Sequence, residues 1–570
     1  MRISESKSKN STSLYIIKST YDGAKHSSRI VEKLGTVDKI KRDHPDIDPY
    51  EWARARLDEL NKAEHTKHQD VLICYSPGKI IDKCEQQLFG GGYLFLQSIY
   101  SELRLGSICK DIATKYKFTY DLSEILSCLI FGRILEPASK LKTHQFSRTL
   151  LKPSTFQLQH TYRALEVIAK DMDFIQSELY KNSKRISKRN DTVLYYDCTN
   201  YFFEIECEDG IRQYGHSKEF RPNPIVQMGL FMDADGMPLA FSINPGNTNE
   251  QITLNPLEKK ILADFCHAKF IVCTDAGLSS IANRKFNDTK ERSFITTQSI
   301  KMLKGYLKKW ALSSSGWRLC EGGKEYDISK IDEEKHKESI FFKERWINDD
   351  GLEQRLIVTY SLKYGAYQRQ IRFRQIERAQ KLISLSPKKI GSLRQNDFKR
   401  LILKTAVTGE GEIAEKTIYA IDEVKIQEEE VFDGFYGVCT NLKGDACKIA
   451  DINKRRWQIE ECFRIMKHEM KARPIYLSRE DRIKAHFMTC FIALIIYRLI
   501  EKRLNGKYTC EEIITGLRSM DFLKVKGEGY IPVYTRTDFT DDLHEAFAFR
   551  TDYQIISSKQ MKKIISSAEK

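Results

Sequence analysis

The sequence predicts an α/β protein in which a mixed-sheet domain is interrupted by a β-rich insertion and preceded by a mostly helical domain. Three observations carry this prediction. Helical periodicity dominates Tyr93–Lys184, and apolar strand-like runs alternate with helical segments from Asp191 to Thr297. Short strands with turn signals fill Ile300–Asp433, after which Asp433–Asn441 returns to the apolar character of the earlier strands.

Length and composition bound the class of protein. A chain of 570 residues is too long for one core, and 41% hydrophobic with 30% charged residues is ordinary globular composition. The 93 Lys and Arg against 78 Asp and Glu give a formal net charge of +15, which indicates a polyanionic partner without identifying it. No Walker A sequence is present, so a nucleotide cofactor is not expected, and no GxSxG motif supports nucleophile chemistry.

Cysteine usage and the chain ends indicate a cytosolic protein. The 14 cysteines form no CxxC pair, which argues against a zinc knuckle, and several lie in apolar runs. We therefore expect reduced core cysteines, such as Cys128, Cys273 and Cys490. The polar N-terminus lacks a signal core, and Phe487–Ile496 is shorter than a membrane span, so we expect a buried helix there and no membrane partner.

The elements follow one another in a defined order. We expect a small N-terminal hairpin, a charged helix, a helical module, five strands with one long helix between the third and the fourth, and a basic C-terminal end that frays. The expected hairpin strands are Ser13–Ile17 and Ser28–Leu34, the charged helix is Asp48–Gln69, the five strands are Val193–Asp197, Ile225–Met232, Pro238–Asn244, Lys269–Asp275 and Ser293–Thr297, and the long helix is Glu250–Cys266.

These patterns divide the chain into six parts. The helical part 71–188 is a candidate DNA-binding domain, although a purely structural role fits its pattern equally well. The parts are 1–70, a small β-hairpin and helical segment; 71–188, helical; 189–299, the first part of the catalytic domain; 300–432, the β-rich insertion; 433–507, the second part of the catalytic domain with its helix; and 508–570, the C-terminal segment.

One stretch of the insertion is strongly basic. Arg372–Lys404 carries ten basic residues against two acidic ones. A solvated face is the ordinary interpretation of such a run. In a protein with a polyanionic partner, a phosphate-contacting surface is the alternative.

Two acids end strands of the expected sheet, Asp197 after VLYY and Asp275 after FIVCT. An Asp at this position is often a turn or helix cap. Carboxylates at strand ends also lie at the mouth of an α/β sheet, where ligands bind. Two neighbouring acids repel unless a cation lies between them, and oxygen-only ligands suit Mg²⁺ or Mn²⁺. With a third carboxylate the set could hold two ions for phosphodiester chemistry.

The third carboxylate is expected on a helix over Asp451–Met470, a stretch with neither Pro nor Gly. At 100° per residue, Asn453, Arg456, Glu460, Phe463 and Lys467 fall within an arc of roughly 80°. Glu460 is thus flanked by two cations and lies beside an apolar stripe. Solvent-exposed pairing of Arg456 with Glu460 is the alternative interpretation. Competing acids are Glu204, Glu206, Asp233 and Glu461.

Several motifs taken together resemble the DDE transposases of bacterial insertion sequences, in the broad insertion-sequence-four group. The resemblance covers most of the chain, and no single motif would be specific. The motifs are FGRILEPASK (Phe131–Lys140), YYDCTNYFFE (Tyr195–Glu204), HSKEFRPNPIVQMGLFMDADGMPL (His216–Leu239), PGNTNE (Pro245–Glu250), TDAGL (Thr274–Leu278), RRWQIEECFRIMK (Arg455–Lys467) and GEGYIPVYTRTDFTDDLHEAFAFRTDY (Gly527–Tyr553).

The resemblance implies an RNase H-like catalytic domain with a β-rich insertion before its last helix, and a metal-binding triad of Asp197, Asp275 and Glu460. The family signature on that helix runs tyrosine, two residues, arginine, three residues, glutamate, six residues, lysine. Arg456, Glu460 and Lys467 match it, and Asn453 stands at the tyrosine position. By resemblance Arg456 and Lys467 contact DNA phosphates, and an asparagine can still hydrogen-bond a phosphate.

The function expected from this resemblance is cut-and-paste DNA transposition. The expected partners are double-stranded DNA, both transposon ends and target, and a second copy of the chain in a synaptic complex. The expected cofactor is Mg²⁺ or Mn²⁺, with two ions per active site, and the expected location is the bacterial cytoplasm at the nucleoid. Two alternatives are a catalytically inactive DNA-binding protein derived from a transposase, and a structure-selective nuclease of the RNase H-like fold.

Overall fold

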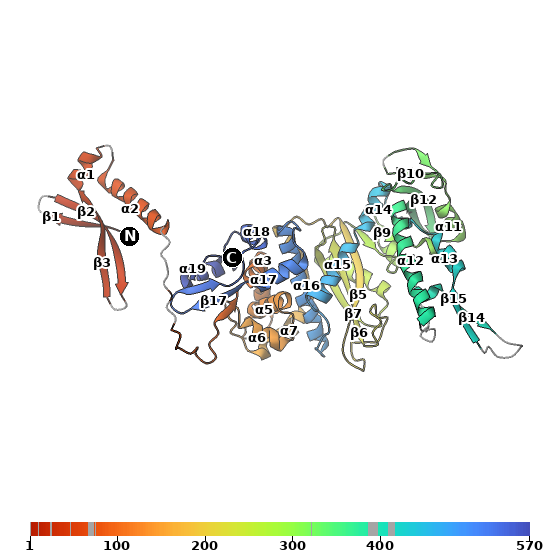
Figure 1. Cartoon of the computed structure of the whole chain (residues 1–570), viewed down its shortest axis with the longest axis horizontal. Helices are drawn as coiled ribbons and strands as arrows, with labels where there is room; N and C mark the ends of the chain where they lie inside the picture. Colours follow the sequence, from red (N-terminus) through yellow and green to blue (C-terminus); the bar gives the residue numbers. More distant parts are fainter. Residues whose placement is uncertain are drawn as a thin grey trace. The chain divides into compact units, whose positions relative to one another are not determined.

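The computed structural model describes residues 2–8, 11–22, 25–45, 47–66, 73, 76–320, 322–385, 397–407 and 416–570. The chain forms two compact units, Met1–Lys83 and Cys84–Lys570. Each unit has its own core, and Asp197, Asp275 and Glu460 all belong to the second. Figure 1 shows the helices and strands of both units.

The first unit is a three-stranded antiparallel sheet with two helices. The expected hairpin is present as the pair β2–β3, and the polar strand β1, which lacks an apolar run, adds a third strand. The charged helix is confirmed as α2, while Lys67–Gln69 of its expected range lie outside the described residues. The elements are β1 (Arg2–Ser8), β2 (Ser11–Asp22), β3 (Lys25–Thr36), α1 (Val37–Asp43) and α2 (Pro49–Thr66).

A ten-stranded mixed sheet organises the second unit, with the strand order β11-β10-β12-β13-β16-β9-β8-β5-β6-β7. The mixed α/β class is therefore confirmed. The five expected strands are β5 (Val193–Phe202), β6 (Ile225–Asp233), β7 (Pro238–Pro245), β8 (Phe270–Thr274) and β9 (Arg292–Thr297). β5, β6 and β7 form an antiparallel meander, whereas β5, β8 and β9 run parallel. The strands therefore change direction at β5, in the middle of this half of the sheet.

The segment 300–432 was expected to form a separate inserted domain. Its strands instead belong to the same ten-stranded sheet. Its strands β12 and β13 join the sheet through β16, which pairs antiparallel with β9. Its apolar side chains nevertheless form their own core around Trp317 and Phe341. The strands are β10 (Trp317–Leu319), β11 (Glu325–Tyr326), β12 (Phe341–Asp349), β13 (Leu352–Tyr360) and β16 (Phe435–Thr440).

The remainder of this segment is a helix and hairpin excursion. It consists of α12 (Leu362–Leu385), β14 (Ile402–Val407), β15 (Lys416–Ile421) and α13 (Glu423–Glu430). Two arginines of the basic run are internal: Arg372 is buried against Asp433, and Arg400 pairs with Glu429 at 2.8 Å. These two cations therefore stabilise the excursion rather than face a phosphate, and residues 386–396 of the run lie outside the described part of the chain.

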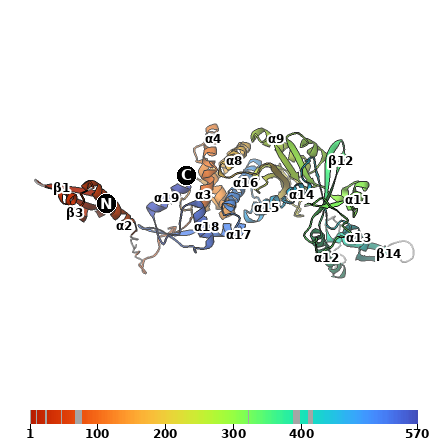
Figure 2. The same ribbon diagram turned by 90° about the horizontal axis from the view of Figure 1, so that it is seen from above.

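Successive side chains of β5 point to opposite faces of the sheet, and each face is covered by a core of its own. Leu194, Tyr196 and Cys198 enter a core that includes side chains of α9 (Leu254–Asp264). Tyr195 and Tyr201 enter the large core on the opposite face. That face carries α14 (Ala446–Lys454), α15 (Trp457–Arg464) and α16 (Glu480–Arg503), while α9 lies on the other side (Figure 2).

Helix α16 connects the sheet with the helical module. It packs against β7 on one side and against α5 and α7 on the other, between the two groups of elements in Figure 1. Among the described residues it is the one helix long and apolar enough to cross a membrane, and 94% of its most apolar window is buried inside the protein. The expected buried helix at Phe487–Ile496 is thus confirmed.

The helical module and the C-terminal segment share one core. The expected fraying end instead forms α19, whose Met561, Ile564 and Ala568 are buried, because these apolar residues recur at helical spacing. A four-stranded sheet, ordered β19-β18-β17-β4, joins the two segments. Its strands are β4 (Leu88–Gly90), β17 (Asp521–Val525), β18 (Gly529–Pro532) and β19 (Ile556–Ser557). The helices are α3 (Tyr93–Glu102), α4 (Leu105–Lys115), α5 (Leu122–Leu135), α6 (Lys140–Ser147), α7 (Leu158–Lys170), α8 (Met172–Ile186), α17 (Cys510–Arg518), α18 (Asp538–Phe547) and α19 (Ser558–Ala568).

Cysteine pairing differs in part from the expectation. Cys320 and Cys447 form a disulfide that links the segment after β10 to the first turn of α14. The cysteines expected in the core, Cys128, Cys273 and Cys490, are free and buried, as predicted. The disulfide joins residues 127 positions apart in the sequence, so their spacing gave no signal of the pair.

Candidate active site

The two acids expected at strand ends lie beside each other, but only Asp275 directly follows its strand, β8, whereas Asp197 lies inside β5, which continues to Phe202. β5 and β8 are parallel neighbours, and Tyr195 is opposite Cys273, so Asp197 and Asp275, each two residues further on, reach the same level. The backbone N–H of Cys198 donates to Asp197 Oδ1 at 2.7 Å, and that of Leu278 donates to Asp275 Oδ1 at 2.9 Å. Each carboxylate is thereby oriented through one oxygen, which leaves its other oxygen for a further ligand.

Burial and the neighbouring carboxylate both disfavour the charged form of Asp197. Burial raises the pKa of Asp197 to about 6, and the negative charge of Asp275 adds to the rise. The ammonium of Lys218, the amide of Cys198 and the guanidinium of Arg456 oppose the rise. A cation shared by the two carboxylates would relieve their repulsion, as the sequence argument requires.

The expected helix over Asp451–Met470 is present in three parts. α14 ends at Lys454, α15 starts at Trp457, and a π-helical turn follows over Ile465–Glu469. Its apolar stripe is confirmed, because Ile459, Phe463, Met466 and Met470 are all buried. Lys467 lies within the π turn, which rotates the chain less per residue than an α-helix does, so the regular arc calculated from an unbroken α-helix does not hold there.

Contacts with alternate residues of β5 show which part of this helix faces Asp197. The Tyr195 hydroxyl donates to the Ile452 carbonyl at 2.9 Å, and Lys467 Nζ donates to Thr199 Oγ1 at 2.7 Å. Asp197 lies between Tyr195 and Thr199 on the same face of the strand. It therefore faces the helix between residues 452 and 467, the stretch that carries Arg456 and Glu460.

Glu460 and its neighbour Glu461 differ in their contacts. Glu461 is engaged by two arginines, Arg464 at 3.5 Å and Arg498 at 3.6 Å. Glu460 is exposed and, within the described part of the chain, has no hydrogen bond or ion pair. The expected pairing of Arg456 with Glu460 is not formed. Of the two, Glu460 is the carboxylate that remains available to a ligand.

The other competing acids are placed differently. Asp233 is fully buried and bound to Arg189 at 2.6 Å, an internal ion pair. Glu204 and Glu206 are exposed beyond the end of β5. None of these three acids is next to Asp197 or Asp275 in the sequence or in strand register, so we do not include them in the site.

Arg456 and Lys467 are both held by hydrogen bonds to threonines of the sheet, beside the acids. Arg456 donates to Thr297 Oγ1 at 2.9 Å, at the end of β9, and its charge acts on Asp197. Burial lowers the pKa of Lys467 to about 8; Lys218 adds to this lowering, and Asp197 opposes it. Both cations are thus held beside the acids by contacts within the protein.

Asn453 is an internal residue, which differs from the expected phosphate contact. Its side chain is 1% exposed and donates to the Tyr436 hydroxyl at 2.7 Å and to Thr297 Oγ1 at 3.2 Å. Both amide hydrogens are thus used inside the protein. Asn453 and Arg456 share Thr297, so the asparagine supports the position of the arginine.

Sequence reasoning did not find Lys218, Thr199, Thr297 or Glu219. Glu219 forms ion pairs with Lys467 at 3.3 Å and with Arg473. Thr199 could have been found, because a β5 strand extended past Asp197 places the residue two positions later on the same face. The loop residues Lys218 and Glu219 carry no periodic signal, since their position depends on tertiary contacts.

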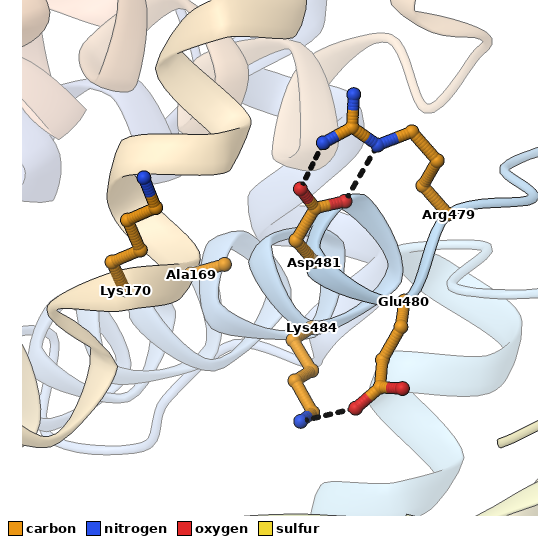
Figure 3. A pocket seen from close by; sticks show the side chains of 6 residues that line it. All are labelled: Ala169, Lys170, Arg479, Glu480, Asp481 and Lys484. Atoms are coloured by element: carbon orange, nitrogen blue, oxygen red, sulfur yellow. Dashed lines mark hydrogen bonds and ion pairs between the residues drawn. The ribbon is translucent and has the colours of Figure 1, made fainter. Parts of the chain in front are cut away.

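A charged hollow between α7 and the start of α16 lies at a different place from the acids (Figure 3). Its side chains neutralise one another: Arg479 pairs with Asp481, and Lys484 pairs with Glu480 at 2.6 Å. Lys170, which also lines the hollow, forms no ion pair with these four side chains, and we assign the hollow no catalytic role.

Two acids on neighbouring parallel strands, faced by a helix that carries cations, form a candidate site for divalent metal ions. A model of the family described as Transposase DDE domain matches residues 193–496, from the first residue of β5 into α16. The match covers more than half of the chain, which therefore belongs to the family of transposase DDE domains.

Comparison with known proteins gives two further findings. No curated protein matches the sequence. Among solved structures, the chain is similar to the piggyBac transposase in a cryo-EM structure of its synaptic complex with hairpin DNA. That likeness has a TM-score of 0.36 and 8% identity, and it covers 84% of this chain and 85% of the other.

Proposed function

We propose that the protein is a cut-and-paste transposase of the insertion-sequence-four group. It binds the terminal inverted repeats of its own element, hydrolyses a strand at each end, and joins the freed 3′-hydroxyl to target DNA. The observation that carries the proposal is the in-register placement of Asp197 and Asp275 on neighbouring parallel strands. The meander followed by parallel strands suits an RNase H-like catalytic domain.

The residues present fit a divalent metal site. Asp197 and Asp275 each keep one oxygen outside their backbone hydrogen bond, Glu460 is available, and the donors are all oxygen, which suits Mg²⁺ or Mn²⁺. When bound, two such ions supply activation of the attacking oxygen and stabilisation of the leaving oxygen. The protein's own contribution is to orient Asp197 and Asp275 through backbone hydrogen bonds and to leave Glu460 free of the arginine pairing that engages Glu461.

Arg456 and Lys467 are proposed to hold phosphates of the transposon end. Arg456 is fixed through Thr297, and Lys467 through Thr199 and Glu219, so the charges are oriented before DNA binds. Charge-assisted contacts of this kind set the register of DNA over the acids. Two ends need two such sites, so we propose a dimer in the synaptic complex, acting at the bacterial nucleoid.

The test uses purified protein, a DNA duplex of the element's own end and Mg²⁺ or Mn²⁺. Cleavage and strand transfer are expected, and Asp197→Ala, Asp275→Ala and Glu460→Ala are each expected to abolish both while end binding persists. Glu461→Ala is the matched control and should remain active. If Glu461→Ala is inactive and Glu460→Ala active, the assignment of the third carboxylate is wrong.

The same assay separates the two alternatives. A transposase-derived protein that only binds DNA would bind the ends without metal-dependent cleavage. A structure-selective nuclease would cleave branched DNA of unrelated sequence as well as it cleaves the ends, and it would not join them to a target. Strand transfer of the specific ends supports the proposal over both.

A further inference from the structure

Two cations of the motif Phe131–Lys140, to which the proposed catalysis gives no role, are buried. Arg133 lies on α5 and is 5% exposed, and Lys140, the first residue of α6, is 6% exposed. Glu136, the one acid between them in the sequence, is exposed. Within the described part of the chain, neither cation forms an ion pair, and Arg133 Nε and Lys140 Nζ have no hydrogen-bond partner. Buried charges are normally paired, so both nitrogen atoms are available to a ligand.

Backbone carbonyls hold the guanidinium of Arg133 in place. Its Nη1 donates to the carbonyls of Met470 and Lys471, each at 3.2 Å, and its Nη2 donates to the Ala138 carbonyl at 3.4 Å. Ala138 is two residues before Lys140, so the guanidinium reaches the start of α6. Met470 directly follows the π turn of the catalytic helix. Arg133 therefore connects the start of α6 with the end of that helix.

Lys140 lies where a positive charge is unfavourable. It occupies the first turn of α6, where the backbone dipole is already positive, and that turn holds no acid. Burial and the charge of Arg133 lower the pKa of Lys140 to about 7. A bound anion offsets these effects, because it interacts favourably with an ammonium, with a guanidinium and with the start of a helix.

Two further ionisable groups beside this pair, His486 and Cys490 of α16, supply no negative charge. Burial, Arg133 and Lys140 hold the pKa of His486 well below its usual value. Its Nε2 lies 3.0 Å from the Ala472 carbonyl, so the neutral ring carries its proton on that nitrogen. Burial raises the pKa of the Cys490 thiol, although both cations oppose the rise, so the thiol is neutral at pH 7. Neither group therefore balances the charge of Lys140.

We propose that the start of α6 holds a small inorganic anion, of the size of chloride, between Lys140 Nζ and Arg133 Nε. Both side chains and His486 are more than nine-tenths buried, so a phosphate that belongs to DNA has no access to them. The anion neutralises the buried pair and, through Arg133, stabilises the turn that follows the catalytic helix. The inference goes beyond the proposed function and does not depend on it, because it needs neither DNA nor a metal ion.

The first measurement compares thermal unfolding in potassium chloride and in potassium gluconate, at equal ionic strength and pH 7. Gluconate is too large for a buried site of this kind, so chloride should raise the melting temperature of the native protein by roughly 2–5 °C. Lys140→Met should lose this difference. In gluconate it should be at least as stable as the native protein, because it removes an unpaired buried charge.

Lys142→Met, at an exposed position of the same helix, is the matched control and should keep the native difference between the two salts. Two results would overturn the inference. One is a native melting temperature that is equal in chloride and gluconate, and the other is a difference that persists unchanged in Lys140→Met.

The second measurement locates the anion directly. Native crystals grown in potassium bromide should give an anomalous-scattering peak between Lys140 Nζ and Arg133 Nε, and crystals of Lys140→Met should give none there. This measurement on the native protein remains decisive if the variant folds poorly. Density at this position without an anomalous signal would identify a water molecule and would overturn the inference.

The third measurement tests the connection to the catalytic helix by hydrogen exchange of the segment Ile465–Ala472. Chloride should slow its exchange several-fold relative to gluconate in the native protein and not in Lys140→Met, while exchange of α18 should be the same in both salts. Exchange of Ile465–Ala472 that does not depend on chloride would show that the anion does not stabilise the end of this helix. None of the three measurements uses DNA, so their outcome is independent of the proposed catalysis.

Discussion

The charge of Asp197 is expected to lower the stability of the metal-free protein. Its folded-state pKa is raised from 3.8 to about 6. A raised pKa means that the folded state binds the proton more tightly, so stability is lost as the pH rises through 6. At about 1.4 kcal/mol per pKa unit, the ionised carboxylate costs at most about 3 kcal/mol above pH 7. Asp197→Asn should remove this cost.

The assay is thermal unfolding without metal at pH 8 and pH 5. Asp197→Asn should raise the melting temperature by roughly a few degrees at pH 8 and by about half as much at pH 5, where the native carboxyl is largely protonated. Asp264→Asn, at an exposed position that ends α9, is the control and should change little. Mg²⁺ should stabilise the native protein and not Asp197→Asn. A variant less stable than the native protein at pH 8, or a gain that does not depend on pH, would refute the reasoning.

Three other predictions follow from the structure. Lys467→Met should reduce the slope of log affinity against log salt concentration for end binding by about one ion, measured by titration; an unchanged slope would show that Lys467 contacts no phosphate. It should also stabilise the free protein at pH 7, because burial lowers the pKa of Lys467 to about 8. Asn453→Ala should cost roughly 2–3 kcal/mol in thermal unfolding and leave the salt slope unchanged, because its bonds are internal; a smaller slope would show a DNA contact. Mass spectrometry without reductant should find the Cys320–Cys447 peptide, and Cys320→Ser should lower stability by about 2–4 kcal/mol; free thiols at both positions would contradict this.

Much of the fold was predictable because its signals are local. The runs ending at Asp197 and Asp275 are apolar and short, so β5 and β8 were found from the sequence, and their neighbourhood was the simplest arrangement of a mixed sheet. The strands of 300–432 were also found, but not their membership of the same sheet. That membership depends on β16 pairing with both β9 and β13, and pairing between distant strands leaves no local trace.

The site was predictable to the same extent. Helical periodicity placed Glu460, Arg456 and the apolar stripe, but it gave no reason to expect a π turn around Lys467. It also placed Asn453 on the charged face, whereas the interruption between α14 and α15 leaves Asn453 buried. Helical periodicity gives the facing positions only of an unbroken helix. Both departures arise where this helix is irregular, after Lys454 and over Ile465–Glu469.

The buried position of Asn453 changes the meaning of the one departure from the family signature. Thr297 accepts hydrogen bonds from both Asn453 and Arg456, and the Tyr436 hydroxyl lies 2.9 Å from the same oxygen. Asparagine, which has two donors, can bond both Thr297 and Tyr436, whereas a tyrosine has one hydroxyl and a ring that needs more room. The substitution is therefore explained by an internal network that fixes Arg456 at the end of β9. In the proposed function the arginine is the residue that contacts DNA, and the asparagine contributes to where that arginine lies through their shared partner Thr297.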